Sequence, residues 1–218
     1  KFHHYAVYSA KAELKSEVAN SYLNWVWWVL EPVCMMFVYM IVFGEIFQMK
    51  EPYFCAFLFI GLSLWGFFNK NLIASVKLVV SNKSVVSKTY LPKTILILSK
   101  IYVNGFKLLI NMAIVVGLML FYHVPLHWRM LEILPLFALL AVLTYSLMVF
   151  LLHLGVFIED MSYVISILLR LLFYLTGIFY DIEKRVKIEP LHSLLGRFNP
   201  MAFIIIQARK VLLHSDLG

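Results

Sequence analysis

The sequence predicts an all-α integral membrane protein, a bundle of helices with several membrane spans. The chain is 62% hydrophobic and 14% charged, whereas about a quarter of the residues in soluble domains are charged. Five apolar segments, each flanked by charge, use most of the 218 residues, and about 20 apolar residues cross a hydrocarbon core about 30 Å thick. The formal charge of +7 is typical of basic loops that face the cytoplasm and anionic lipid. Nucleic acid is not a predicted partner, because no basic stripe lies outside the loops.

Residues 1–24 precede the first span and are predicted to form an amphipathic helix on the cytoplasmic membrane surface. Four apolar residues recur there at helical spacing, with charged residues between them: Ala6, Ala10, Leu14 and Val18. A helix that only anchors the chain explains the same pattern. The chain starts at Lys1 without Met, so we expect the true N-terminus to be missing. Residues 25–218 form the predicted transmembrane domain.

The predicted spans are Trp25–Gly44, Phe54–Ser75, Thr94–Tyr122, Leu131–Ile158 and Tyr163–Tyr180. Between the second and third spans, Lys77 and Val80–Lys93 carry four lysines and no acid, which places this loop in the cytoplasm. Residues 181–218 then lie outside, although they carry six basic residues. The first loops usually dominate orientation, so we expect residues 181–218 outside despite their basic residues. Asn199-Pro200 is typical of a helix start, and the helix Met201–Leu213 is too short to span and either re-enters the membrane or lies on its surface.

Polar residues inside spans are costly and usually face a bundle interior, a cavity or a partner. The third span carries four of them at i, i+4, i+7 and i+11, on one helical face: Lys100, Asn104, Lys107 and Asn111. Glu31, Lys100 and Arg170 lie at similar depth, about 10 Å from the cytoplasmic ends of their spans. We therefore predict an intramembrane polar layer of Glu31, Lys100, Lys107 and Arg170, with Glu31 neutralising one of the bases. Alternatively, each charge reaches the headgroups separately.

Motifs for catalysis or cofactor binding are absent from the sequence. It has no G-x-x-x-x-G-K-[ST] phosphate loop, H-E-x-x-H or C-x-x-C, so no cofactor or metal is predicted in this chain. An intramembrane acyltransferase-like enzyme using His153 or His123 is one alternative, but it requires an acid and a base that converge on one cavity. A structural membrane scaffold is another.

Four stretches carry a family resemblance: SYLNWVWWVLEPVCMMFVYMIVFG at Ser21–Gly44, FFNKNLIASVKLVVSNKSVVSKTYLPK at Phe67–Lys93, GVFIEDMSYVISILLRLLFYLTGIFYDIE at Gly155–Glu183, and NPMAFIIIQARKVLL at Asn199–Leu213. Together they resemble the membrane subunit of type 2 ABC exporters for O-antigen, capsule and teichoic acid. The third stretch looks closest to teichoic acid exporters. The resemblance covers nearly the whole chain.

The resemblance implies roles by position. Residues 80–93 would hold the coupling segment that docks on the ATPase subunit, with Ser84, Val85, Val86 and Ser87 at its centre. Glu159 and Asp160 would match an acidic bend, usually Arg-Asp in the family, that also faces the ATPase. Residues 181–213 would be outer re-entrant helices. The first and fifth spans would line the conduit, with Tyr39, Phe173 and Tyr174 as lining residues. A sixth span is expected beyond Gly218.

The predicted function is that of a permease subunit in an ATP-driven exporter of a lipid-linked cell-envelope polymer, in a bacterial plasma membrane. The chain alone is then not an enzyme. The implied partners are two ABC ATPase subunits that bind ATP and Mg, a second copy of this chain, the polymer and membrane lipid. The alternative on the same scaffold is an exporter of a small drug or lipid, for which a narrow apolar cleft replaces a wide aromatic conduit.

Overall fold

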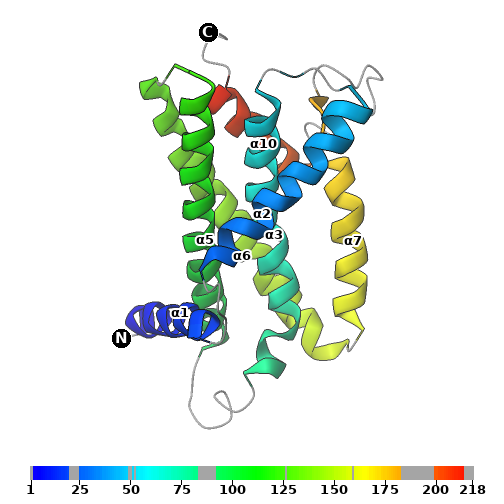
Figure 1. The fold of residues 1–218 in the computed structure, drawn as a ribbon. Coiled ribbons are helices and arrows are strands. Elements are labelled where there is room, and N and C mark those ends of the chain that lie inside the picture. The colour runs from blue at the N-terminus through cyan, green and yellow to red at the C-terminus, as the bar shows by residue number, and fades with distance from the viewer. Residues whose placement is uncertain are drawn as a thin grey trace.

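The computed structural model describes residues 2–19, 25–48, 51, 53–82, 92–125, 127–158, 160–182 and 199–213. Within these ranges every regular element is a helix (Figure 1). The helices are α1 (Phe2–Ala19), α2 (Val26–Tyr39), the π-helix η1 (Met40–Ile46), α3 (Phe54–Ser81), α5 (Lys93–Phe121), the 3₁₀ helix η2 (Trp128–Glu132), α6 (Ile133–Phe157), α7 (Met161–Leu175) and α10 (Pro200–Leu213).

Four helical segments among the described residues are long and apolar enough to cross a membrane: Val26–Ile46, Phe54–Val79, Lys93–Phe121 and Trp128–Phe157. They confirm the first four predicted spans. The fifth, Tyr163–Tyr180, is helical only to Leu175. Its helix α7 has 15 residues and is therefore about 22 Å long, shorter than a hydrocarbon core of about 30 Å. The chain turns after Thr176 at Gly177, whose φ of +69° suits glycine.

The central helix of the bundle is α3. In its membrane-spanning stretch 72% of the residues are buried, against 6% for Val26–Ile46. Helices α2, α5, α6, α7 and α10 all pack against α3, and its Phe59, Ile60 and Leu64 are fully buried. A helix surrounded by others loses its contact with lipid, so its polar residues can only meet polar groups of neighbouring helices.

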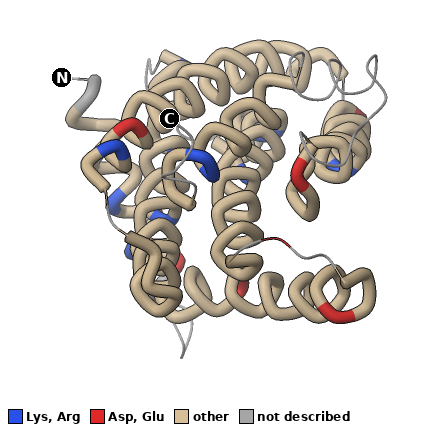
Figure 2. Tube along the Cα trace, turned by 90° about the horizontal axis from the view of Figure 1, so that it is seen from above, with Lys and Arg blue, Asp and Glu red and all other residues tan. Residues whose placement is uncertain are grey.

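Helix α1 lies crosswise to the spans, at the end of the bundle that also holds the α6–α7 connection (Figure 1). Ala6 and Ala10 are buried, and the Ser99 hydroxyl of α5 donates to the carbonyl oxygens of Ala6 (3.3 Å) and Ile95 (3.0 Å). Lys and Arg gather on the side where the N-terminus lies (Figure 2). Ala6 and Ala10 therefore lie on the side of α1 that packs against α5.

Helix α10 lies at the opposite end of the bundle (Figure 1). Asn199 begins it as predicted, because its Oδ1 accepts hydrogen bonds from the backbone N–H groups of Met201 (3.1 Å) and Ala202 (3.2 Å). Its Nδ2 also donates to the Thr176 hydroxyl at 3.2 Å. The same asparagine therefore caps α10 and ties it to the turn after α7.

Candidate functional site

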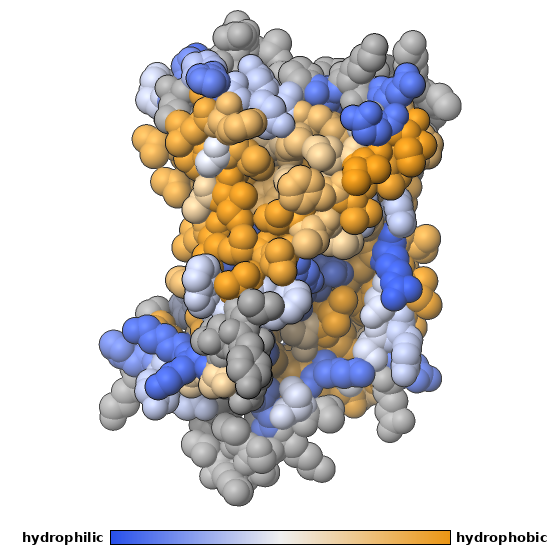
Figure 3. Space-filling model, in the orientation of Figure 1, coloured by the Kyte–Doolittle hydropathy of each residue, from blue (hydrophilic) through white to orange (hydrophobic). Residues whose placement is uncertain are grey.

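A cavity of about 680 Å³ lies between α2, α3, α5 and α7, with Glu17 of α1 at its edge. Hydrophilic residues interrupt the apolar surface halfway between the two ends of the bundle (Figure 3). The aromatic residues that line the cavity are Trp27, Trp28, Tyr39, Trp65, Phe67, Phe173 and Tyr174. The charged ones are Glu17, Glu31, Lys70, Lys107 and Arg170. The cavity thus combines rings with charges of both signs.

The aromatic part of the wall comes from three helices. The Phe173 ring of α7 lies 5.7 Å from the Trp65 ring of α3 and 6.2 Å from the Tyr39 ring of α2, centroid to centroid. These distances are typical of aromatic pairs. All three residues predicted to line the conduit, Tyr39, Phe173 and Tyr174, border this one cavity, although they come from segments more than 130 positions apart.

The charges on the cavity are paired differently from the prediction. Glu31 forms an ion pair with Lys70 of α3 at 2.9 Å, so the hypothesis that Glu31 neutralises Lys100, Lys107 or Arg170 was wrong. The physical reason is that α1 brings its own carboxylates to the two lysines of α5. Among the described residues Arg170 makes no ion pair, and it borders the cavity.

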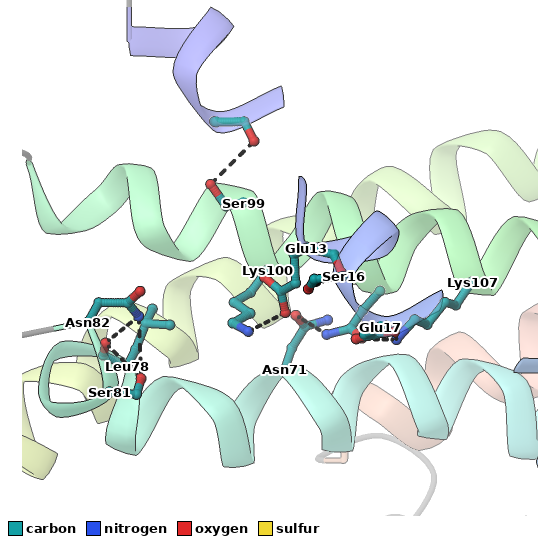
Figure 4. A network of polar contacts seen from close by, with 12 residues as sticks. Glu13, Ser16, Glu17, Asn71, Leu78, Ser81, Asn82, Ser99, Lys100 and Lys107 are labelled. Carbon is teal, nitrogen blue, oxygen red and sulfur yellow. Dashed lines mark hydrogen bonds and ion pairs between the residues drawn. The ribbon is translucent and has the colours of Figure 1, made fainter. Parts of the chain in front are cut away.

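Helix α1 is joined to α5 by two ion pairs. Glu13 pairs with Lys100, and Glu17 pairs with Lys107 at 2.7 Å. The indole N–H of Trp28 also donates to Glu17, at 3.1 Å. Figure 4 shows the two carboxylates of α1 facing the two lysine amines of α5. Through Glu17, these contacts connect α1 directly to Trp28 and Lys107, which line the cavity.

Another polar residue of α5, Asn104, contacts α3. Asn104 Nδ2 donates to Asn71 Oδ1 at 2.9 Å, and Asn71 Nδ2 donates to the Phe67 carbonyl at 2.8 Å. Within the described residues, Ser63 Oγ and Asn111 Oδ1 are buried and have no hydrogen-bond partner, and both residues line the cavity. A buried polar atom without a partner costs about 1–3 kcal/mol. The cavity therefore offers two polar atoms that a hydroxyl group can satisfy.

The predicted coupling residues are described only in part. Ser84, Val85, Val86, Ser87 and Glu159 lie outside the described residues. Asp160 immediately precedes α7, its side chain makes no capping hydrogen bond, and its backbone oxygen accepts from Tyr163 at 3.0 Å and Val164 at 3.3 Å. Its carboxylate stands at the positive end of the helix dipole.

Sequence reasoning did not assign a site role to Lys70, Glu13, Glu17 or Arg209. Lys70 and Arg209 each stand in an apolar stretch, and a charge in such a stretch is itself a signal of a specific partner. Glu13 and Glu17 are spaced by four residues and so share a face of α1, but only the position of α5 reveals what that face contacts.

Of the two histidines considered for an intramembrane enzyme, His153 already has a hydrogen-bond partner. His153 Nδ1 lies 2.9 Å from the Val149 carbonyl of its own helix, and His153 is exposed on the outside of α6. His123 lies in the turn after α5, with φ of +54°. In the described part of the chain, no group of three or more His, Cys, Asp or Glu is placed to hold a metal.

Comparison with known proteins identifies the scaffold. The family model for the ABC-2 type transporter matches residues 7–213. An O-antigen export system permease protein RfbA from Klebsiella pneumoniae is 24% identical over 207 residues, which cover 94% of this chain and 79% of the relative. A second from Klebsiella pneumoniae is 23% identical with the same coverage. One from Myxococcus xanthus is 25% identical over 206 residues, with 94% and 78% covered. The match over nearly the whole chain and the helical membrane bundle together show that the chain belongs to the ABC-2 type transporter family of membrane permeases.

Proposed function

We propose that this chain is the membrane subunit of an ATP-driven exporter that moves a lipid-linked, sugar-rich polymer across a bacterial plasma membrane. The polymer is an O-antigen, a teichoic acid or a capsule-like polysaccharide. The relatives named above are O-antigen export permeases. The observation that carries the proposal is the cavity, whose wall combines aromatic rings with basic side chains.

This wall suits the chemistry of the polymer. Aromatic rings such as Phe173 and Tyr174 stack on the apolar faces of sugars. Arg170, which lines the cavity and makes no ion pair among the described residues, attracts the phosphates of a lipid-linked or anionic polymer. A cavity of about 680 Å³ holds a small-molecule-sized group rather than a polymer. A complete conduit therefore needs a second copy of this chain.

Energy for transport comes from a partner in this proposal. The sequence contains no phosphate loop, so ATP and Mg are bound by two ATPase subunits that dock on the segment around Ser84–Ser87. Closure of those subunits on ATP would move this segment and, through it, α3 and α5. Both helices line the cavity.

The first test is co-purification of the chain with candidate ATPase subunits, followed by an ATPase assay. We expect a stable complex with nucleotide-dependent activity that is lost when Ser84–Ser87 is scrambled. Trp128→Ala, an exposed position at the opposite end of the bundle, should leave the complex intact. A chain that purifies alone and works without nucleotide would favour the enzyme alternative.

The substrate is tested in cells that lack the chain. We expect polymer to accumulate inside and to return to the surface on complementation. Tyr39→Ala or Phe173→Ala should lower surface polymer several-fold while the ATPase complex still forms. Sensitivity to small drugs without polymer accumulation would instead indicate a drug or lipid exporter.

A further inference from the structure

Arg209 of α10 is a buried arginine with three carbonyl partners. Only 4% of its surface is exposed. Its Nε donates to the carbonyl of Phe57 at 3.1 Å, its Nη1 to that of Gly177 at 2.8 Å, and its Nη2 to that of Ile178 at 2.7 Å. The guanidinium carbon also lies 3.5 Å from the centre of the Phe57 ring. One side chain thus joins α10 to the first turn of α3 and to the turn after α7.

The charge of this arginine is retained at neutral pH. Burial lowers the pKa of the Arg209 guanidinium to about 9, while the negative charges of Asp181 and Glu51 act to raise it. A buried cation is costly unless it is hydrogen-bonded. Here the guanidinium donates to the carbonyl oxygens of Gly177 and Ile178. These residues follow the end of α7, so no further helical turn supplies N–H donors to their carbonyls.

Two glycines stand close to Arg209 and to the turn that it contacts. Gly61 lies beneath the guanidinium, and a Cβ atom there would stand 2.5 Å from Arg209 Nη2. Gly177 adopts the left-handed conformation, and a Cβ atom there would lie 2.5 Å from Ile182 Cγ1. Two glycines therefore shape the space in which Arg209 meets the turn.

The turn held by Arg209 carries Phe179, which packs on the end of the cavity. Phe179 is 2% exposed. Its ring stacks on Phe43 at 4.2 Å and lies 4.8 Å from Tyr39 and 5.2 Å from Phe173. Tyr39 and Phe173 line the cavity, whereas Phe43 and Phe179 do not.

The order along the chain places this aromatic group. Helix α2 with its continuation η1, and helix α7, both run along the chain toward the α10 end of the bundle (Figure 1). Phe43 comes four residues after Tyr39 in that direction, and Phe179 follows Gly177 and Ile178, whose carbonyls Arg209 of α10 contacts. The four rings therefore form a layer between the cavity and the α10 side. We call Tyr39, Phe43, Phe173 and Phe179 the aromatic layer.

We propose that Arg209 is a positioning residue that holds the aromatic layer closed, because it fixes the Gly177–Ile178 turn and with it the ring of Phe179. This inference goes beyond the proposed function, since it concerns how the cavity is sealed from the α10 side and not what the cavity carries. Release of the three carbonyls frees the turn, and Phe179 then leaves Tyr39 and Phe43. The cavity opens to the α10 side.

A thiol inside the cavity reports this opening. Gly66 lines the cavity, and a Cβ atom at Gly66 meets nothing within 4 Å, so Gly66→Cys is accommodated. In a Cys34→Ser, Cys55→Ser background, labelling by a charged, membrane-impermeant thiol reagent is measured separately from the two sides of the membrane. With Arg209 present we expect little labelling from the α10 side.

Arg209→Met should raise the labelling rate from the α10 side about tenfold. Arg209→Lys keeps the charge but loses the three-way geometry, and should give an intermediate rate. Gln207→Ala, a partly buried position on the same helix, should leave the rate unchanged. An unchanged rate in a stably inserted Arg209→Met or Arg209→Lys variant would overturn the proposal. Export is not measured, so failure of the proposed function does not affect this result.

A second route leaves Arg209 in place. Gly61→Ala should displace the guanidinium and raise labelling from the α10 side when Arg209 is present. The double variant Gly61→Ala, Arg209→Met should be labelled no faster than Arg209→Met alone. The reason is that Arg209 Nη2, with which the new methyl group collides, is then absent. Equal effects of Gly61→Ala in both backgrounds would show that Gly61 acts independently of Arg209, and would contradict the mechanism. This arm gives an answer even where Arg209→Met fails to insert.

Discussion

At the scale of single residues, Glu17 is the point where three helices meet. It lies on α1, accepts a hydrogen bond from the Trp28 indole at the start of α2, and pairs with Lys107 of α5. The Lys107 amine also lies 5.4 Å from the centre of the Trp28 ring, within the range of a cation–π contact. The three side chains therefore stabilise one another, and the removal of one side chain removes one contact from each of the other two.

We predict that Glu17→Gln and Lys107→Met are coupled in their effect on stability. Because both side chains are partly exposed, with 35% and 19% of their surface accessible, the coupling should be about 1 kcal/mol and weaken in high salt. It is measured by a double-mutant cycle on unfolding in detergent. Lys15→Met, an exposed change on the same helix, is the control. Strictly additive effects would show that the contact contributes nothing.

At the scale of elements, the bundle depends on how closely α6 approaches α3. A Cβ atom at Gly155 of α6 would lie 2.3 Å from the Val76 carbonyl oxygen and 2.9 Å from Val76 Cγ1. Real Cβ contacts are longer than this, so only glycine permits the approach. Gly117 of α5 is different, since a Cβ atom there meets nothing within 4 Å.

These two glycines make a matched pair of variants. Gly155→Ala should destabilise the fold by about 2 kcal/mol, because α6 must move away from α3. Gly117→Ala should be neutral or stabilising by up to about 1 kcal/mol, because alanine is the better helix former. Thermal unfolding in detergent compares them. Similar midpoints for the two variants would contradict the close packing of α3 and α6.

At the scale of the whole molecule, the two ends of the bundle differ. One end carries α1 and the α6–α7 connection, and the other carries α10 and the turn between α5 and α6 (Figure 1). The lysine-rich stretch of the sequence between α3 and α5 contains no acid, which favours the cytoplasm for the α1 end. The basic residues of 181–218 oppose this orientation, so it needs a direct test.

Sidedness follows from labelling of single cysteines in the Cys34→Ser, Cys55→Ser background. Both Lys11 on α1 and His127 before η2 are exposed. We expect the thiol of His127→Cys to react in intact cells, and that of Lys11→Cys to react only after the membrane is opened. The reverse pattern would place α10 in the cytoplasm.

The sequence predicted the helices well and their contacts poorly. Apolar length alone located the four long spans, and Asn199-Pro200 located the start of α10. The end of α7 was missed, because Gly177 and Ile178 are apolar enough to continue a span. The partner of Glu31 was also missed, because depth along a helix says nothing of which neighbour a side chain faces.

By itself, the sequence determined that this protein lies in a membrane, where it is helical, and which residues within the spans are polar. These properties depend on hydrophobicity and local spacing, which are written in the chain. Only the tertiary structure decided that Lys70 pairs with Glu31, that α1 supplies the carboxylates for Lys100 and Lys107, and that Arg209 holds the turn after α7. Each of these contacts joins residues far apart in sequence, so it depends on how the helices pack and not on any local pattern.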